Sequence, residues 1–83
     1  MKVLKFFANW CKPCKKLSFN IHCIKSEITY PVEEINVDTN RELAARYNIS
    51  ALPTMILIDD DKEVRRITGL PPKQELRSFF DLK

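Results

Sequence analysis

The chain has 83 residues, of which 45% are hydrophobic and 30% charged, with a single glycine and a formal net charge of +3. This composition predicts one small ordered domain, residues 1–83, rather than a linker or a disordered tail. The charge is too small and too dispersed to predict a nucleic-acid partner, and no apolar stretch approaches the ~20 residues of a membrane span.

The hydrophobic pattern predicts four strands and three helices. A buried strand is expected over residues 3–8, followed by a helix from residue 12 on which apolar residues recur at helical spacing as far as residue 28. A second strand is expected within residues 29–38, and then a short helix over 39–47 with a capping box of Thr39 and Glu42. Residues 54–68 fit an antiparallel hairpin, and a proline pair at 71–72 starts a last helix.

The order β-α-β-α-β-β-α predicts an α/β fold, a four-stranded mixed sheet flanked by three helices. Two right-handed crossover units are expected, so that the first three strands run parallel and helices cover both faces of the sheet. The fourth strand is expected to run antiparallel at an edge.

The beginning of the chain is interpreted as a strand and not as a signal peptide. Lys5 and Asn9 interrupt its apolar run, and no small-residue cleavage site follows. Three cysteines, an odd number, fit a secreted disulfide framework poorly. We therefore expect a cytoplasmic protein, and we expect it to be a monomer without a membrane or nucleic-acid partner.

Two cysteines stand two residues apart in FFANWCKPCKK, residues 6–16, and a zinc site is one reading of them. Cys11, Cys14, His22 and Cys23 are the available ligands. His22 lies 11 residues after Cys11, or ~16 Å along a helix, whereas a tetrahedral site spans ~4 Å. The four side chains cannot converge on one ion, so no metal is expected.

A redox-active pair explains the two cysteines better. Cys11 is expected at a helix N-terminus, where the dipole and unpaired N–H groups stabilise a thiolate, so it is the predicted nucleophile. Cys14 lies one turn further on and can attack a mixed disulfide on Cys11. Pro13 is tolerated in the first turn of the helix, and Lys12 adds positive charge beside the thiolate.

Two segments resemble the thioredoxin family. FFANWCKPCKKL is similar to the active-site segment of thioredoxins, usually Trp-Cys-Gly-Pro-Cys-Lys, and INVDTNRELAARYNISALPTMILI is similar to the stretch that ends in Pro-Thr and an apolar strand. The resemblance continues to Gly69. It implies a thioredoxin fold and a dithiol–disulfide oxidoreductase that reduces protein disulfides. It also implies an NADPH-dependent thioredoxin reductase as electron donor and no cofactor besides the Cys11–Cys14 disulfide.

The resemblance also implies a peptide-binding groove beside the cysteines. In such proteins the proline matching Pro53 is cis and lies against the dithiol, and the backbone of the preceding residue, here Leu52, pairs with an extended substrate. Trp10, Ala51, Leu52 and Gly69 would line this docking surface. Trp10 is expected to be exposed.

The sequence departs from the family at three places. It begins at the strand that leads into the dithiol, so it resembles a minimal thioredoxin of glutaredoxin size. Thioredoxins usually carry a buried Asp six residues before the first cysteine and a Lys paired with it, where this chain has Lys5 and Glu34. We expect these two to form a partly buried ion pair, with Glu34 as the acid–base group for Cys14; alternatively Lys5 reaches water. Lys12 replaces the usual Gly and is expected to make the couple more oxidising.

Two other functions stay open. A glutaredoxin-like protein would use glutathione as reductant, although CKPC, SALPT and TGLPPK differ from the usual glutaredoxin segments. A binding module of the same fold would have little need for both cysteines and the Trp. Cys23 is expected to be an incidental, semi-exposed thiol, with Phe19 beside it covered by another element or a partner, and His22 a solvated helix residue.

Overall fold

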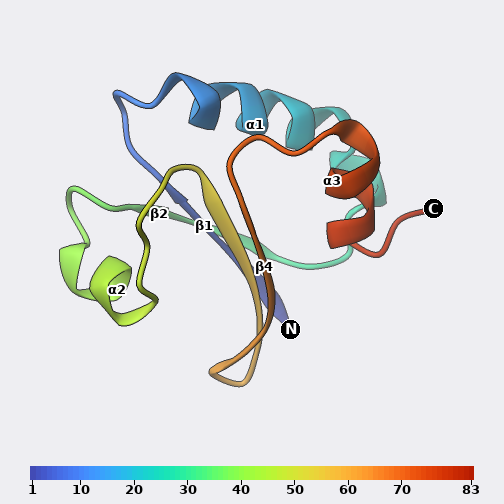
Figure 1. The fold of residues 1–83 in the computed structure, drawn as a ribbon. Coiled ribbons are helices and arrows are strands. Elements are labelled where there is room, and N and C mark those ends of the chain that lie inside the picture. The colour runs from blue at the N-terminus through green and yellow to red at the C-terminus, as the bar shows by residue number, and fades with distance from the viewer.

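The computed structural model describes residues 1–83 and contains a four-stranded sheet with three helices packed around it (Figure 1). The strands are β1 (Lys2–Phe7), β2 (Val32–Asn36), β3 (Thr54–Asp59) and β4 (Lys62–Thr68). The helices are α1 (Lys12–Cys23), α2 (Arg41–Arg46) and α3 (Lys73–Phe79), and a short 3-10 helix follows α1 at Lys25–Glu27. The predicted element order and the mixed sheet are confirmed. None of the helices is both long and apolar enough to cross a membrane.

The direction of the third strand was predicted wrongly. The strands lie in the order β2-β1-β3-β4, and β1 is parallel to β2 but antiparallel to β3, which is in turn antiparallel to β4. α2 has six residues and so extends only ~9 Å, about half the length of a strand. The chain therefore stays at the end of the sheet where β2 finishes, and Thr54 of β3 pairs there with Phe6 of β1.

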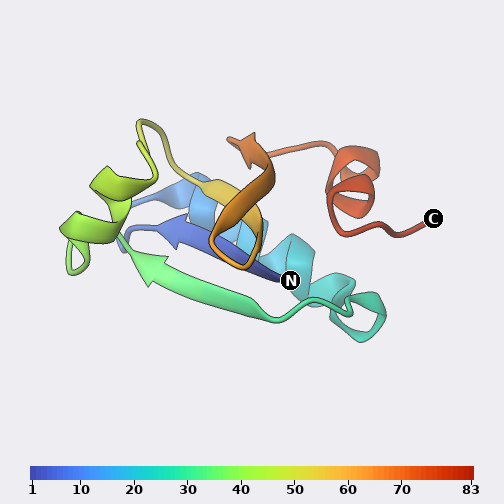
Figure 2. The same cartoon turned by 90° about the horizontal axis from the view of Figure 1, so that it is seen from below.

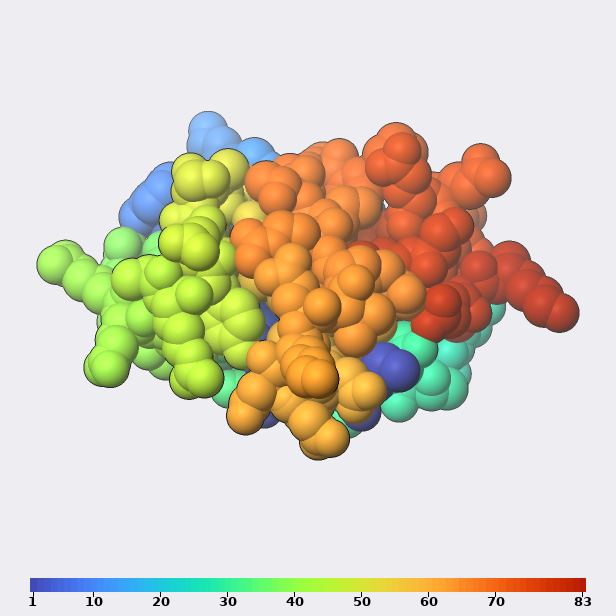
Figure 3. Space-filling model, turned by 60° about the horizontal axis from the view of Figure 1, so that its bottom comes forward, coloured from blue at the N-terminus to red at the C-terminus, as the bar shows by residue number.

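The two faces of the sheet are covered by different helices, as predicted. α1 and α3 lie on one face (Figures 1 and 2), where a buried cluster contains Val3, Leu17, Ile24, Met55, Leu57, Leu76, Phe79 and Phe80. α2 covers the other face over Leu4, Phe6, Ile35, Ile56 and Ile58. In Figure 3, α2 and the β3–β4 hairpin form one continuous surface of the molecule. Odd-numbered β1 side chains, including that of Lys5, consequently point toward α1.

The starts of α1 and α2 differ in how they are capped. Cys11 has extended backbone (φ −87°, ψ 105°) and its Sγ accepts the N–H of Cys14 at 3.2 Å, so this cysteine caps α1. The capping box expected at Thr39 is wrong: α2 begins after Asn40 without a side-chain cap, and the Thr39 hydroxyl donates to the Asn36 carbonyl at 3.3 Å instead. A local hydrogen bond of Thr to the preceding turn competes with the cap that the sequence pattern suggests.

α3 and the C-terminal residues are fastened to the body by charged groups. Asp81 accepts from the Tyr30 hydroxyl and pairs with Arg65 at 3.0 Å, and these two groups hold the pKa of Asp81 below its usual range. Arg77 binds both carboxylate oxygens of Glu27 at 2.9 and 2.8 Å, which lowers the pKa of Glu27.

Candidate active site

The cysteine pair lies where β1 ends and α1 begins. Cys11 and Cys14 are joined by a disulfide with Cα atoms 5.3 Å apart, and their residues are only 4% and 2% exposed. They pack with Ala8 into a small cluster that Leu52 also contacts. The cluster therefore joins the dithiol to the loop that precedes β3.

The N-terminus of α1 provides the electrostatic setting of the dithiol. The backbone N–H of Cys14 already points at the Cys11 sulfur, and the first turn contains Pro13 and no acidic residue. Unpaired N–H groups and the positive end of the helix dipole favour a negative charge at this position. After reduction, the arrangement can stabilise Cys11 as a thiolate.

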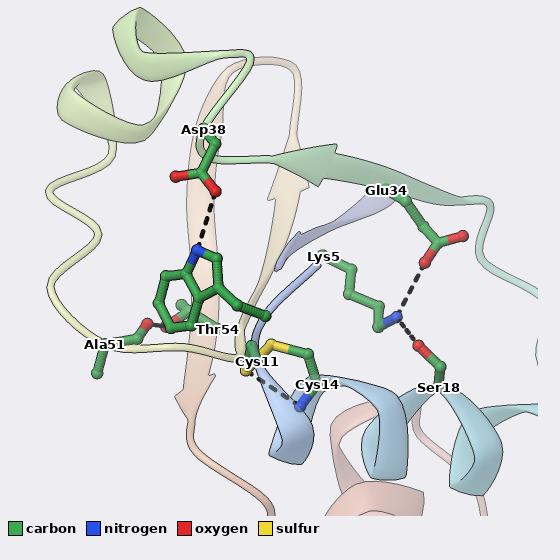
Figure 4. The surroundings of a disulfide bond; sticks show 9 residues. Lys5, Cys11, Cys14, Ser18, Glu34, Asp38, Ala51 and Thr54 are labelled. Atoms are coloured by element: carbon green, nitrogen blue, oxygen red, sulfur yellow. Dashed lines mark hydrogen bonds and ion pairs between the residues drawn. A yellow bond between two sulfur atoms is a disulfide. The ribbon is translucent and has the colours of Figure 1, made fainter. Parts of the chain in front are cut away.

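Trp10, which precedes the dithiol, is exposed as predicted. The residue is 69% exposed. Its indole Nε1 nevertheless donates a hydrogen bond to the Asp38 carboxylate at 2.9 Å, which holds the side chain in place (Figure 4). The Asp38 N–H in turn donates to the Asn36 side chain at 2.9 Å. Sequence reasoning missed Asp38, although the signal was present: it follows β2 as Trp10 follows β1, and parallel strands end at the same edge of a sheet.

A groove of about 640 Å³ opens beside Cys11. Its lining is mostly apolar and consists of Trp10, Cys11, Lys12, Pro13, Val37, Ala44, Ile49, Ser50, Ala51 and Leu52. Three of the four residues expected at a docking surface are among them, and Gly69 is not. The floor from α2 and its neighbours, Val37, Ala44 and Ile49, was missed because nothing in the sequence places α2 next to the dithiol.

Pro53 lies behind the groove and not in its lining. It is fully buried, the Leu52–Pro53 peptide is cis, and its carbonyl accepts the N–H of Gly69 at 2.7 Å. Gly69 has φ +84°, a left-handed conformation that glycine adopts without strain. Thr54 donates its hydroxyl to the Ala51 carbonyl at 2.7 Å, which further fixes the loop beside Cys11 (Figure 4).

Lys5 and Glu34 form the expected ion pair. The Lys5 side chain is only 3% exposed, and its ammonium lies 2.9 Å from the Glu34 carboxylate, whose own side chain is 59% exposed. The ammonium also donates to the Ser18 hydroxyl (Figure 4). The alternative in which Lys5 reaches water is therefore wrong. Ser18 was missed, although it stands four residues after Cys14 and so shares its helix face.

A second hollow, of about 420 Å³, lies on the inner side of the dithiol. Cys14, Ser18 and Glu34 are among the residues that line it. The inner cysteine and the Glu34 carboxylate therefore face the same space, which is large enough for water molecules.

The other candidate residues lie away from the dithiol. His22 and Cys23 are exposed on α1, and no group of three or more His, Cys, Asp or Glu side chains is arranged to hold a metal ion. Phe19, expected to be covered, is 61% exposed, with the Lys16 ammonium 5.8 Å from its ring centre. The expected cover is therefore wrong within this chain, where the Lys16 ammonium lies over the ring and the ring stays exposed.

Comparison with known proteins identifies the same family along the whole chain. The family model Thioredoxin matches residues 1–82. A thioredoxin of Chlamydia caviae is 37% identical over 75 residues, which cover 89% of this chain and 74% of that protein. A thioredoxin of Chlamydia pneumoniae is 35% identical, with coverage of 95% and 78%. The solved thioredoxin of Fasciola hepatica is 37% identical with a TM-score of 0.83, covering 94% of this chain and 75% of that one.

Proposed function

This chain belongs to the thioredoxin family of thiol–disulfide oxidoreductases, and we propose that it reduces disulfides of other proteins through Cys11 and Cys14. The observation that carries the proposal is the position of the two cysteines, at a helix N-terminus that opens onto an apolar groove. A dithiol needs both features, a stabilised thiolate and a surface on which a polypeptide can present its disulfide.

The proposed reaction has two exchange steps. The Cys11 thiolate attacks one sulfur of the substrate disulfide, a mixed disulfide forms, and the first substrate thiolate leaves and takes up a proton. The Cys14 thiolate then attacks the Cys11 sulfur, which releases the second substrate thiolate and forms the Cys11–Cys14 disulfide. Two electrons pass from the dithiol to the substrate, and a separate reductase must return them.

Glu34 is the proposed acid–base group for the second step. Cys14 must lose its proton before it attacks, and Glu34 shares a hollow with it. The Lys5 ammonium keeps Glu34 near this position through their 2.9 Å contact. Lys5 is thus a positioning residue, and its positive charge also favours the Cys14 thiolate.

Substrate binding is assigned to the groove. In this proposal Trp10, Ala51 and Leu52 contact the polypeptide, Pro13 with Lys12 forms the rim next to Cys11, and Pro53 and Gly69 support the loop from behind. Leu52 offers its backbone to an extended segment. The protein acts as a cytoplasmic monomer in electron transport and redox homeostasis, with a thioredoxin reductase as donor and no bound cofactor.

Trapping of the mixed disulfide tests the assignment of roles. Reduced Cys14→Ser is mixed with a disulfide-linked peptide dimer and analysed without reducing agent. With the exposed Cys23 replaced by Ser in both proteins, we expect one peptide to stay attached to Cys11, whereas Cys11→Ser should capture none. Capture by Cys11→Ser but not by Cys14→Ser would reverse the roles, and capture by neither would refute the reaction.

The redox potential separates the proposed donor from glutathione. The protein is equilibrated with glutathione and dithiothreitol buffers, and the trapped thiols are counted by mass. A potential of about −270 mV would fit reduction of the Cys11–Cys14 disulfide by a thioredoxin reductase, and a potential of about −200 mV would favour a glutaredoxin-like cycle with glutathione.

A further inference from the structure

The groove beside Cys11 contains a single charged side chain. Seven of its ten lining residues are hydrophobic, and the other three are Pro13, the neutral Ser50 and Lys12. Lys12 is therefore the one charged side chain of the lining. Lys12 is exposed and forms no ion pair and no hydrogen bond, in contrast to Lys2 and Lys5. Its ammonium is therefore free to pair with a charge on whatever occupies the groove.

The other charged side chains near the dithiol either lie outside the groove or are already hydrogen-bonded. Lys15 lines the hollow on the inner side of the dithiol, and Lys16 lies against the Phe19 ring. Asp38 is the carboxylate next to the groove, and it accepts the indole N–H of Trp10. Of the three lysines of α1, only Lys12 lines the groove.

We propose that the groove selects polypeptides with an acidic residue close to the substrate's disulfide cysteine, and that the Lys12 ammonium forms an ion pair with this residue. The proposal rests on the disulfide reductase function proposed above. In an extended substrate, side chains two residues apart point to the same side and are separated by ~6.5 Å. A substrate cysteine that faces Cys11 therefore directs the side chains two residues away toward the same surface, which includes Lys12.

The exposure of Lys12 sets how strongly an acidic residue can raise the rate constant of the exchange reaction. An ion pair with one exposed, flexible partner changes a rate constant by about two- to fivefold, and salt screens it. Raising the ionic strength from 0.01 M to 1 M shortens the screening length from about 30 Å to about 3 Å, so the preference should vanish at high salt.

The test compares two synthetic peptides, each presented as its symmetrical disulfide dimer. They differ only two residues from the cysteine, where one has Glu and the other Lys. Pre-reduced protein is mixed with each dimer, and the rate constant for formation of the Cys11–Cys14 disulfide is measured by thiol trapping and mass spectrometry. The readout is the ratio of the Glu rate constant to the Lys rate constant.

Two variants with the same change of charge show whether the ratio depends on Lys12 itself or only on the net charge of the protein. Lys12→Gln removes the proposed contact, and Lys62→Gln removes one charge from the distant β3–β4 hairpin. The intrinsic reactivity of each peptide, and any general effect of Lys12 on the Cys11 thiolate, cancels when the ratios of different proteins are compared. At low salt we expect the ratio to be two- to fivefold lower in Lys12→Gln than in the natural protein, and unchanged in Lys62→Gln.

The outcomes separate this inference from the proposed function. An unchanged ratio in Lys12→Gln, or an equal drop in Lys62→Gln, would overturn the selection by Lys12 while the peptides are still reduced. If neither dimer oxidises the dithiol of the natural protein, or if Cys11→Ser releases peptide thiols as fast, the disulfide reductase function itself fails.

Discussion

Glu34 holds a buried positive charge in place, so its neutralisation should destabilise the fold. Glu34→Gln keeps the shape of the side chain but leaves the Lys5 ammonium, only 3% exposed, without a carboxylate. Breaking a fully buried pair in this way costs about 3–5 kcal/mol, whereas an exposed pair contributes at most about 1 kcal/mol. Because Glu34 is itself 59% exposed, the expected loss lies between these values, at about 1–3 kcal/mol.

This loss is large for a chain of this size. A domain of 83 residues has a free energy of unfolding of about 4–12 kcal/mol, and each kcal/mol shifts its Tm by about 4–8 °C. Urea unfolding at pH 7, followed by circular dichroism, measures the difference directly. Glu33→Gln is the matched control, because Glu33 is the preceding residue of β2 and pairs with Lys2 while both side chains are about half exposed.

The stability of Lys5→Met tests whether the unpaired buried charge is what destabilises Glu34→Gln. Methionine has a similar length and removes the buried charge together with its need for a partner, so this variant should be about as stable as the natural protein or more stable. The expected order of stability is Lys5→Met, then Glu33→Gln, then Glu34→Gln. If Glu34→Gln were as stable as Glu33→Gln, or if Lys5→Met were the least stable of the three, the pair would not act as argued.

Two further predictions concern pH and redox potential. In the folded protein the pKa values of Asp81 and Glu27 lie below their ordinary values of 3.8 and 4.5. The stability that these carboxylates contribute is therefore complete above the ordinary pKa values, and it is lost as the pH falls through the lowered pKa values of the folded protein. The double variant Asp81→Asn, Glu27→Gln should therefore lose less stability between pH 7 and pH 3 than the natural protein in urea unfolding, and an equal loss would contradict this. The positive charge of Lys12 next to Cys11 is expected to stabilise the thiolate of the reduced form, so Lys12→Gly should lower the potential of the couple by about 5–20 mV in glutathione equilibration. An unchanged or higher potential would contradict this expectation.

Much of the fold and part of the site could be predicted from the sequence, because both depend on local patterns. The buried run of β1 and the change to helical spacing after Lys12 placed Cys11 at a helix N-terminus without any tertiary information. The pairing of Lys5 with Glu34 depends on the register of β1 with β2, which aligns them directly; here the resemblance to thioredoxins supplied what periodicity lacks. Ser18 and Asp38 were missed because their partners, Lys5 and Trp10, belong to other elements, so their signals (the helix face shared with Cys14, and the position just after β2) become informative only once those elements are placed side by side.

The wrong direction of β3 was inconsistent with another expectation drawn from the same sequence. β1 ends next to Cys11, so a parallel third strand would start at the opposite end of the sheet, a strand length of about 20 Å away. Pro53, which immediately precedes that strand, could then not lie against the dithiol as the resemblance implied. The observed pairing of Phe6 with Thr54 removes the conflict, since an antiparallel β3 starts at the end where β1 finishes and brings Leu52 against the cysteines. A requirement for two distant segments to meet at one site thus constrains strand direction, and it would have corrected the topology before any coordinates were known.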